Sequence, residues 1–211
     1  MRMPIFKGLR KETMSDKKIW NNLRNGDQKA LEEIYRTNFS ELYVYGKRFC
    51  KDASTVEDCI QELFEELWNR KGKLSETDAI KPYLFVSLKR KIFHTIKKVR
   101  KTTDTELEEN YFDVELSIDQ ILIAEETSIE QKTKLQSAFN ELSDRQKEIL
   151  YLKYYSEMDY EEISRIMEMN YQSARNLVSR AIQKLAKHML IVFILLFERS
   201  LALKHIPTFQ N

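Results

Sequence analysis

Residues 159–188 read DYEEISRIMEMNYQSARNLVSRAIQKLAKH and predict two short helices joined by a tight turn. Asp159 followed by Glu162 forms a capping box for the first helix, and Asn170 is a suitable N-cap for the second. Apolar residues of the second helix recur at i, i+3, i+4, i+7, i+8, i+11 and i+12, which makes a single helical stripe. They are Ala174, Leu177, Val178, Ala181, Ile182, Leu185 and Ala186.

The opposite face of this second helix is polar and cationic, with no Asp or Glu between Glu168 and Glu198. Amide and guanidinium side chains on a rigid helix can pair with base edges and phosphates in a major groove. The segment therefore predicts a helix-turn-helix that binds duplex DNA. The residues expected to face DNA are Gln172, Ser173, Arg175, Asn176, Ser179, Arg180 and Lys184. The alternative is an amphipathic hairpin whose basic face is simply solvated.

Composition favours helices throughout the chain. Its 211 residues include only 4 Gly and 3 Pro, so turns that need special backbone angles must be few. The formal net charge of +2 hides strongly uneven blocks. Residues 81–101 hold eight cations and no carboxylate, whereas residues 104–130 hold ten carboxylates and no Lys or Arg. Local charge blocks of this kind indicate the binding partners of a protein better than its net charge does.

The pattern predicts an all-α protein of two small helical domains joined by an acidic linker, the C-terminal domain being the helix-turn-helix. The expected divisions are a flexible N-terminus (1–19), an N-terminal helical domain (20–101), the acidic linker (102–133), the C-terminal domain (134–188) and an apolar tail (189–211). In the N-terminal domain, residues 27–51 predict a long helix or a pair of helices. Ser54 with Glu57 predicts the start of the next helix, and Pro82 suits the first turn of another that ends near Arg100.

Two further features concern the C-terminal half. Ser143 with Gln146 forms another capping box, just ahead of the helix-turn-helix. Residues 189–197 are nine consecutive apolar residues, too few to cross a membrane. We expect this run to extend the last helix and to pack on its own domain or on a second copy. A docking site for a regulator or a membrane surface is the alternative.

The sequence gives no support for a catalytic site, a metal site or a cofactor. Cys50 and Cys59 form no CxxC pair, and the chain has only three His, so no zinc-like spacing exists. The N-terminus lacks the continuous apolar region of a secretory signal. We therefore expect a cytoplasmic protein that is not an enzyme.

Three segments, in this order, resemble the minimal, two-domain extracytoplasmic-function (ECF) group of the sigma-70 family of bacterial sigma factors. They are DASTVEDCIQELFEELWNRKGKL (52–74), KPYLFVSLKRKIFHTIKK (81–98) and LSDRQKEILYLKYYSEMDYEEISRIMEMNYQSARNLVSRAIQKL (142–185). The resemblance covers about residues 20–188. It implies a protein that binds core RNA polymerase and directs promoter recognition and transcription initiation.

The resemblance also implies roles for particular residues. The outward ridge of the first segment would contact core RNA polymerase, through Asp58, Gln61, Glu62, Glu65 and Trp68. The second segment would hold the downstream promoter element and the opened strand, with Lys89, Arg90 and Lys97 as cations toward DNA. Tyr83 stands where many members carry Trp. The helix-turn-helix would bind the upstream promoter element.

Two other functions remain open on sequence grounds. One is an autonomous helix-turn-helix regulator that dimerises through its tail and binds a palindromic site. The other is a phosphohydrolase or similar carboxylate-metal enzyme built on the acidic helix, which the lack of His ligands disfavours. The partners expected from the resemblance are core RNA polymerase, promoter DNA and an anti-sigma factor.

Overall fold

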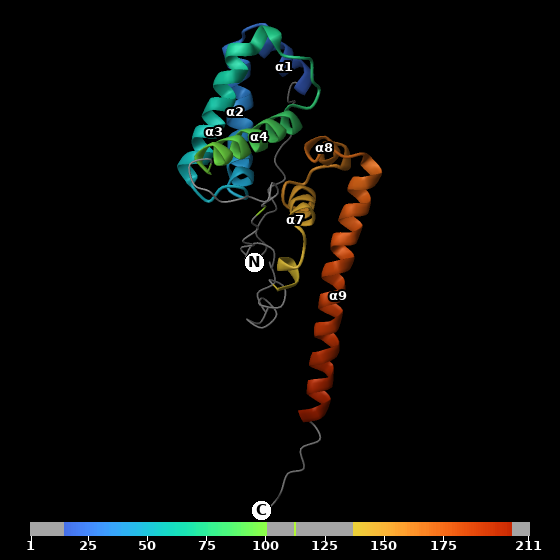
Figure 1. Cartoon of the computed structure of the whole chain (residues 1–211). Helices are drawn as coiled ribbons and strands as arrows, with labels where there is room; N and C mark the ends of the chain where they lie inside the picture. Colours follow the sequence, from blue (N-terminus) through green and yellow to red (C-terminus); the bar gives the residue numbers. More distant parts are fainter. Residues whose placement is uncertain (1–14, 101–111, 113–136, 204–211) are drawn as a thin grey trace, which may run out of the picture. The chain divides into compact units, whose positions relative to one another are not determined.

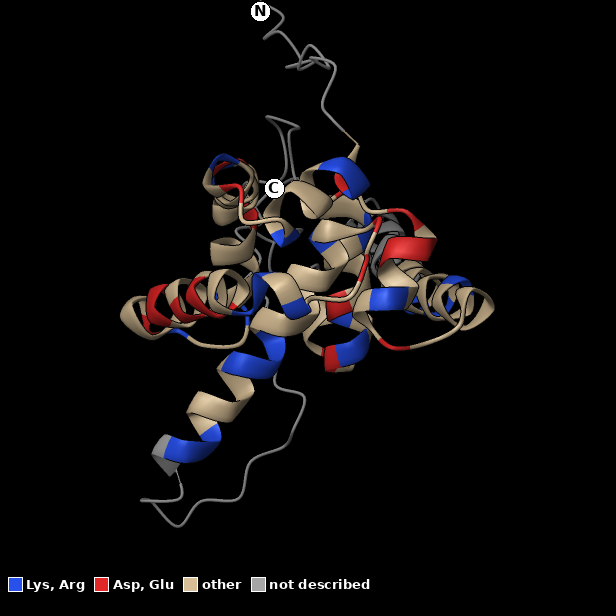
Figure 2. Ribbon diagram, turned by 90° about the horizontal axis from the view of Figure 1, so that it is seen from above, with Lys and Arg blue, Asp and Glu red and all other residues tan. Residues whose placement is uncertain are grey.

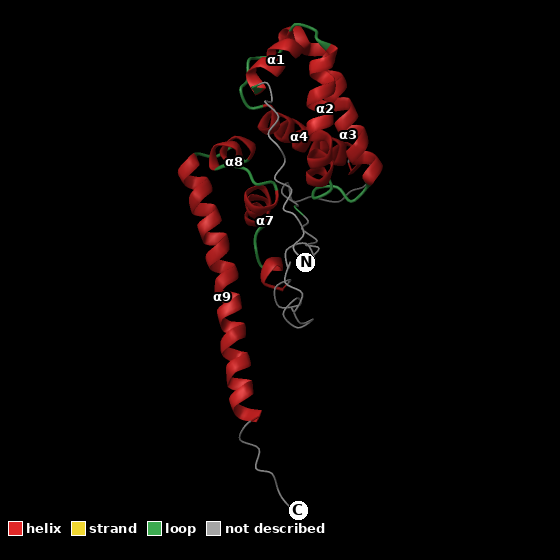
Figure 3. Ribbon diagram, turned by 180° about the vertical axis from the view of Figure 1, so that it is seen from behind, coloured by secondary structure: helices red, strands yellow, loops and turns green. Residues whose placement is uncertain are grey.

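The computed structural model describes residues 15–100, Phe112 and residues 137–203. Over this part of the chain every regular element is helical and no strand occurs, as the composition predicts (Figure 3). Contacts divide the chain into two compact units, residues 1–98 and 99–211. None of the described helices is both long enough and apolar enough to cross a membrane.

The N-terminal unit is a small helical domain. Its elements are α1 (Asp16–Arg24), α2 (Gln28–Gly46), α3 (Ala53–Arg70), the 3-10 turn η1 (Lys71–Lys73) and α4 (Ile80–Arg100). Helices α2 and α3 lie side by side, and α1 packs on α2 (Figure 1). Large side chains from all four helices fill the core, among them Trp20, Leu42, Tyr45, Ile60 and Phe85. Each such apolar side chain contributes about 1.5–3 kcal/mol when it is removed from water.

The start of α3 differs from the prediction, because Asp52 and not Ser54 is the N-cap. The Asp52 carboxylate accepts hydrogen bonds from the Thr55 backbone N–H and the Ser54 hydroxyl, both at 2.9 Å. A charged carboxylate is the stronger acceptor, so the Ser54 hydroxyl serves as a donor inside the first turn. Hydrogen bonds from the side chain and backbone of Thr55 and the side chain of Ser54 lower the pKa of Asp52 to about 2.

The C-terminal unit contains α7 (Asp144–Leu150), which continues into the π-helical turn η2 (Tyr151–Tyr155), then α8 (Tyr160–Ile166) and α9 (Tyr171–Leu203). Both α7 and α8 pack against α9 (Figure 1). The two predicted capping boxes are present, Ser143 with Gln146 and Asp159 with Glu162. Asn170 caps α9 as predicted, since its side-chain oxygen accepts from the Ser173 N–H at 2.7 Å.

Several boundaries differ from those expected. Residues 16–19, assigned to a flexible N-terminus, belong to α1, because Ile19 and Trp20 anchor that helix in the core. At the other end α9 runs through the apolar run to Leu203, so the predicted extension of the last helix is confirmed. The packing of that extension and nearly all of the acidic linker fall outside the described residues. Two residues of the predicted apolar stripe, Ile182 and Ala186, are exposed, Ile182 by 41%.

Candidate functional site

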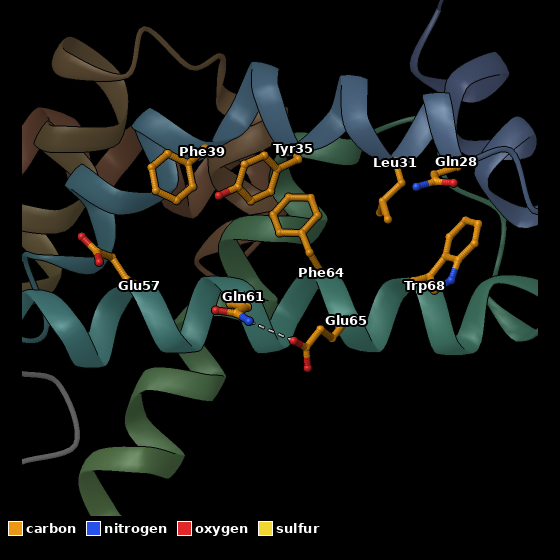
Figure 4. A pocket seen from close by; sticks show the side chains of 9 residues that line it. All are labelled: Gln28, Leu31, Tyr35, Phe39, Glu57, Gln61, Phe64, Glu65 and Trp68. Carbon is orange, nitrogen blue, oxygen red and sulfur yellow. Dashed lines mark hydrogen bonds between the residues drawn. The ribbon is translucent and has the colours of Figure 1, made fainter.

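The predicted acidic ridge lies on the solvent-facing side of α3. Asp58, Gln61, Glu62 and Glu65 are all exposed, while the opposite side of the helix is buried in the core. The Gln61 amide donates to Glu65 Oε1 at 3.1 Å, which orders part of the ridge (Figure 4). Because α3 has one apolar and one acidic face, its carboxylates point toward solvent and not into the core.

Beside this ridge, α2 and α3 form a shallow groove of about 560 Å³. Its lining is mainly aromatic and aliphatic with polar residues among it, and consists of Gln28, Leu31, Tyr35, Phe39, Glu57, Gln61, Phe64, Glu65 and Trp68 (Figure 4). Trp68 is half-buried, with the Lys71 ammonium 4.1 Å from the centre of its ring. Gln61, Glu65 and Trp68 of the predicted set thus lie on one groove, which combines an apolar surface with negative charge.

Glu62 has a partner that the sequence did not indicate. The Lys91 ammonium from α4 lies 3.2 Å from Glu62 Oε2 and 2.6 Å from Glu66 Oε1. Burial of Lys91 acts to lower its pKa, but the hydrogen bonds that its ammonium donates to Glu66 and Glu62 outweigh burial and leave the pKa raised. The predicted basic block on α4 and the acidic ridge on α3 therefore partly neutralise each other at this point. Among the described residues no cation forms an ion pair with Asp58 or Glu65.

The cysteines have no arrangement suited to nucleophilic chemistry. Both are free thiols, and Cys59 is buried with its Sγ 3.6 Å from the Thr95 hydroxyl. Burial is the main cause that raises the pKa of the Cys59 thiol, so the thiolate is disfavoured. Among the described residues no group of His, Cys, Asp or Glu side chains is placed to hold a metal ion.

The cations predicted to face DNA on α4 differ in exposure. Arg90 and Lys97 are exposed, whereas Lys89 is half-buried with its ammonium 5.3 Å from the centre of the Phe49 ring. Of the aromatic residues on α4, Phe85 is wholly buried, but Tyr83 is 37% exposed. Tyr83 packs edge-on against buried Trp20 with ring centres 5.0 Å apart. Helix α4 therefore presents exposed cations together with the exposed ring of Tyr83, which Trp20 holds in place.

Helix α9 carries the predicted polar face. Gln172, Ser173, Arg175, Asn176, Ser179 and Arg180 are all exposed, on the side of the helix away from buried Ala174, Val178 and Ala181. Lys184 is instead half-buried and donates to the carbonyl of Glu141. Lys184 thus holds parts of its own unit together. Figure 2 marks cations and carboxylates on the ribbon, and the marked residues of α4 are all cations.

The turn before α9 has no glycine. Glu168 adopts a left-handed backbone angle, φ 51°, which side chains other than glycine rarely take. The Arg145 guanidinium donates to the carbonyl of Met167 at 3.2 Å and helps hold this turn. Strain here is therefore balanced by a contact from α7.

Tyr171 is a residue that the sequence-based set omitted. It is the first residue of α9 and is 46% exposed, with its ring edge-on to Tyr160 at 5.7 Å. Tyr160 in turn lies 4.6 Å below the Lys153 ammonium. The first residues of a recognition helix are those that contact bases. Position alone could therefore have placed Tyr171 in the set.

Comparison with known proteins gives consistent results for both halves of the chain. The sequence model of sigma-70 region 2 matches residues 34–102, and that of sigma-70 region 4 matches residues 132–185. The chain is 26% identical over 158 residues to the ECF RNA polymerase sigma factor SigM of Bacillus subtilis (strain 168), covering 74% of this chain and 93% of SigM. It is 22% identical over 160 residues to RNA polymerase sigma factor YlaC of the same organism, covering 76% and 92%.

A solved structure supports the same fold. The sigma factor RpoE, in a co-crystal structure with the anti-sigma factor NepR from Bartonella quintana, matches with a TM-score of 0.51 and 18% identity over 77% of this chain and 98% of that one. Two sigma-70 regions in their expected order, on two helical units, confirm the resemblance seen in the sequence. The chain belongs to the sigma-70 family, in its ECF group.

Proposed function

We propose that this protein joins core RNA polymerase through α3 and directs it to promoters through α4 and α9. The observation that carries this proposal is the separation of charge and chemistry between the two units. One unit exposes an acidic ridge beside an apolar groove on α3. The other exposes amides and guanidiniums along α9. A single chain with both surfaces can bind an enzyme and DNA together.

The polymerase contact is assigned to the ridge and groove of α3. Trp68 and Phe64 supply apolar area, and aromatic residues dominate the energy of many interfaces. Asp58 and Glu65 supply charge, which steers a cationic partner toward the groove and sets its orientation. Glu62 contributes less net charge because it is paired with Lys91.

The DNA contacts are assigned to α9 and α4. Gln172, Arg175 and Asn176 lie near the start of α9, where side chains can pair with base edges in a major groove. On α4, Arg90 and Lys97 would neutralise phosphates, and exposed Tyr83 would stack on an unpaired base. Lys184 is left out of the set of base contacts because its ammonium is bound to the Glu141 carbonyl.

Three further parts of the proposal follow from this role. The protein acts in the cytoplasm, where the polymerase and the genome are, and it has no catalytic function of its own. The RpoE structure contains an anti-sigma factor, so we include an anti-sigma protein as a partner class. An autonomous dimeric regulator is not favoured, because the match to sigma-70 region 2 would then have no role.

Charge reversal on α3 tests the polymerase contact. Asp58→Lys and Glu65→Lys should each abolish most co-purification with core RNA polymerase, while circular dichroism stays helical. The matched control is Glu32→Lys on α2, an exposed carboxylate that does not line the groove. It should bind as the unaltered chain does. If all three variants retain binding, the contact lies elsewhere.

A further inference from the structure

Phe112 is a buried residue in a segment that neither family region covers. The matches to regions 2 and 4 end at residue 102 and begin at residue 132. Phe112 is nevertheless only 1% exposed. Its ring centre lies 5.7 Å from that of Tyr151, with the rings at 65° to each other. This edge-to-face geometry is a favourable one for aromatic pairs.

The partner ring belongs to the folded part of the C-terminal unit. Tyr151 is the first residue of η2, is 6% exposed, and stacks on Tyr155 at 4.8 Å. The π-helical turn brings these two tyrosines together directly after α7. Phe112 therefore completes a set of three rings, two from η2 and one from the segment that connects the units.

We propose that Phe112 is a positioning residue that ties the connecting segment to the C-terminal unit. With Phe112 anchored, only residues 101–111 connect the two units. Without the anchor, the connection would extend from residue 101 to Ser137. Phe112 does not contact DNA or polymerase in this proposal. It acts by limiting how far α9 can move from α4, and its effect on promoters rests on the function proposed above.

The lengths give the expected size of the effect. From the end of α4 at Arg100, the chain is about 12 residues long to Phe112 and about 37 to Ser137. For a random-coil tether of these lengths, the root-mean-square span would be about 20 Å or about 33 Å respectively. Effective concentration falls roughly as the −3/2 power of tether length. Release of Phe112 should therefore lower the effective concentration of one unit near the other by about fivefold.

Paired insertions test the anchor without altering Phe112. About ten Gly-Ser residues are inserted either after Thr103 or after Glu126, on the two sides of Phe112. Fluorophores are placed at Asn69→Cys on α3 and Gln183→Cys on α9, both exposed, in a chain with Cys50→Ser and Cys59→Ala. The insertion after Thr103 should lower energy transfer, whereas the one after Glu126 should leave it unchanged. Equal losses from the two insertions would overturn the proposal.

Substitutions add a second, independent measurement in the same labelled chain. Phe112→Ser should lower energy transfer further than the insertion after Thr103, and Phe112→Leu, which keeps an apolar side chain, should restore it. Circular dichroism of all variants should be the same, since Phe112 lies outside the described helices. If energy transfer in Phe112→Ser equals that in the unaltered chain, Phe112 is not an anchor.

Run-off transcription with core polymerase then tests the consequence for function. Phe112→Ser should raise about fivefold the concentration of chain needed for half-maximal transcription and should broaden the tolerated spacing between the two promoter elements. If energy transfer responds but spacing preference and half-maximal concentration do not, the tether has no role in promoter choice. If the unaltered chain fails to start transcription while energy transfer responds, the proposed function fails and the anchor stands.

Discussion

The ammonium of Lys91 lies 2.6 Å from Glu66 Oε1, so that a cation of α4 binds a carboxylate of α3. Glu62 shares the same ammonium at 3.2 Å. Both carboxylates are about 60% exposed, and ion pairs in such a setting typically stabilise a protein by about 0.2–1 kcal/mol. The pair therefore orients side chains at the junction of the two proposed binding surfaces more than it stabilises the fold.

Lys91→Met should accordingly lower the free energy of unfolding by no more than about 1 kcal/mol, measured in urea at neutral pH. The pKa of Lys91 is raised in the folded state, so its contribution is complete below the ordinary lysine value of 10.5 and is lost as pH rises through the folded value. The difference between the two proteins should shrink above pH 10.5. Lys98→Met removes an exposed cation of the same helix and is the matched control, which should leave the free energy of unfolding nearly unchanged at neutral pH.

Gly46→Ala should destabilise the N-terminal unit. A Cβ at this position would lie 2.7 Å from Val56 Cγ1 and 3.1 Å from Ile92 Cδ1, so three helices approach too closely for a methyl group. Overpacking of this kind typically costs about 1–3 kcal/mol. Chemical denaturation should show the loss, and adding Val56→Ala should recover part of it.

Gly72→Ala is the matched control for this crowding, because nothing lies within 4 Å of the Cβ it would add. It should be neutral or stabilise the unit by a few tenths of a kcal/mol, roughly, since alanine restricts the unfolded chain. Equal losses in both variants would mean that glycine flexibility, and not close packing, is needed at Gly46.

Glu168→Gly should stabilise the C-terminal unit. The φ of 51° at Glu168 destabilises the fold by roughly 1–2 kcal/mol for a residue other than glycine. Glycine relieves this strain, but its greater conformational freedom in the unfolded chain offsets roughly 0.5–1 kcal/mol of the gain. The net gain should be about 0.5–1 kcal/mol and should appear as a higher thermal midpoint. Glu168→Ala removes the same carboxylate without relieving the backbone and should show no gain.

These positions also show what sequence could predict. Capping boxes at Ser143 and Asp159 were predictable because each depends on residues three apart in the chain. The Asn170 cap of α9 was predictable for the same reason, because its side chain accepts from the N–H of Ser173, three residues on. An interaction between residues close together in the chain can therefore be predicted from the sequence alone.

Other features depended on tertiary contacts. The pairing of Lys91 with Glu62 and the burial of Phe112 join residues far apart in the chain, which no local pattern reports. The exposure of Ile182 could not be predicted, because periodicity marks an apolar stripe but not how much of it the neighbouring helices cover. The predicted cap Ser54 was wrong because the Asp52 carboxylate, two residues earlier, is the stronger acceptor and caps α3 instead.

Asp52→Ala should destabilise α3 in a pH-dependent way. The pKa of Asp52 is about 2 in the folded protein against an ordinary value of 3.8, so its carboxylate stabilises the fold fully above that ordinary value. The contribution is lost as pH falls through the folded value. Unfolding curves of the two proteins should therefore differ at pH 6 and converge near pH 2. A difference that persists unchanged in acid would mean that a contact other than the charged cap is responsible.

Tyr171→Ala should weaken binding to upstream promoter DNA by about tenfold, while Tyr171→Phe should retain most of the affinity. The ring stands at the start of α9, where a base contact is worth about 1–3 kcal/mol. Tyr160 braces it at 5.7 Å, so little conformational entropy is lost on binding. Ile182→Ala is the control, since Ile182 is a similarly exposed apolar residue three turns further along α9. Run-off transcription across promoter variants would distinguish a contact to a base from a contact to the DNA backbone. A loss confined to promoters with particular upstream bases supports Tyr171 as a base contact. A uniform loss across all promoters assigns Tyr171 to the DNA backbone.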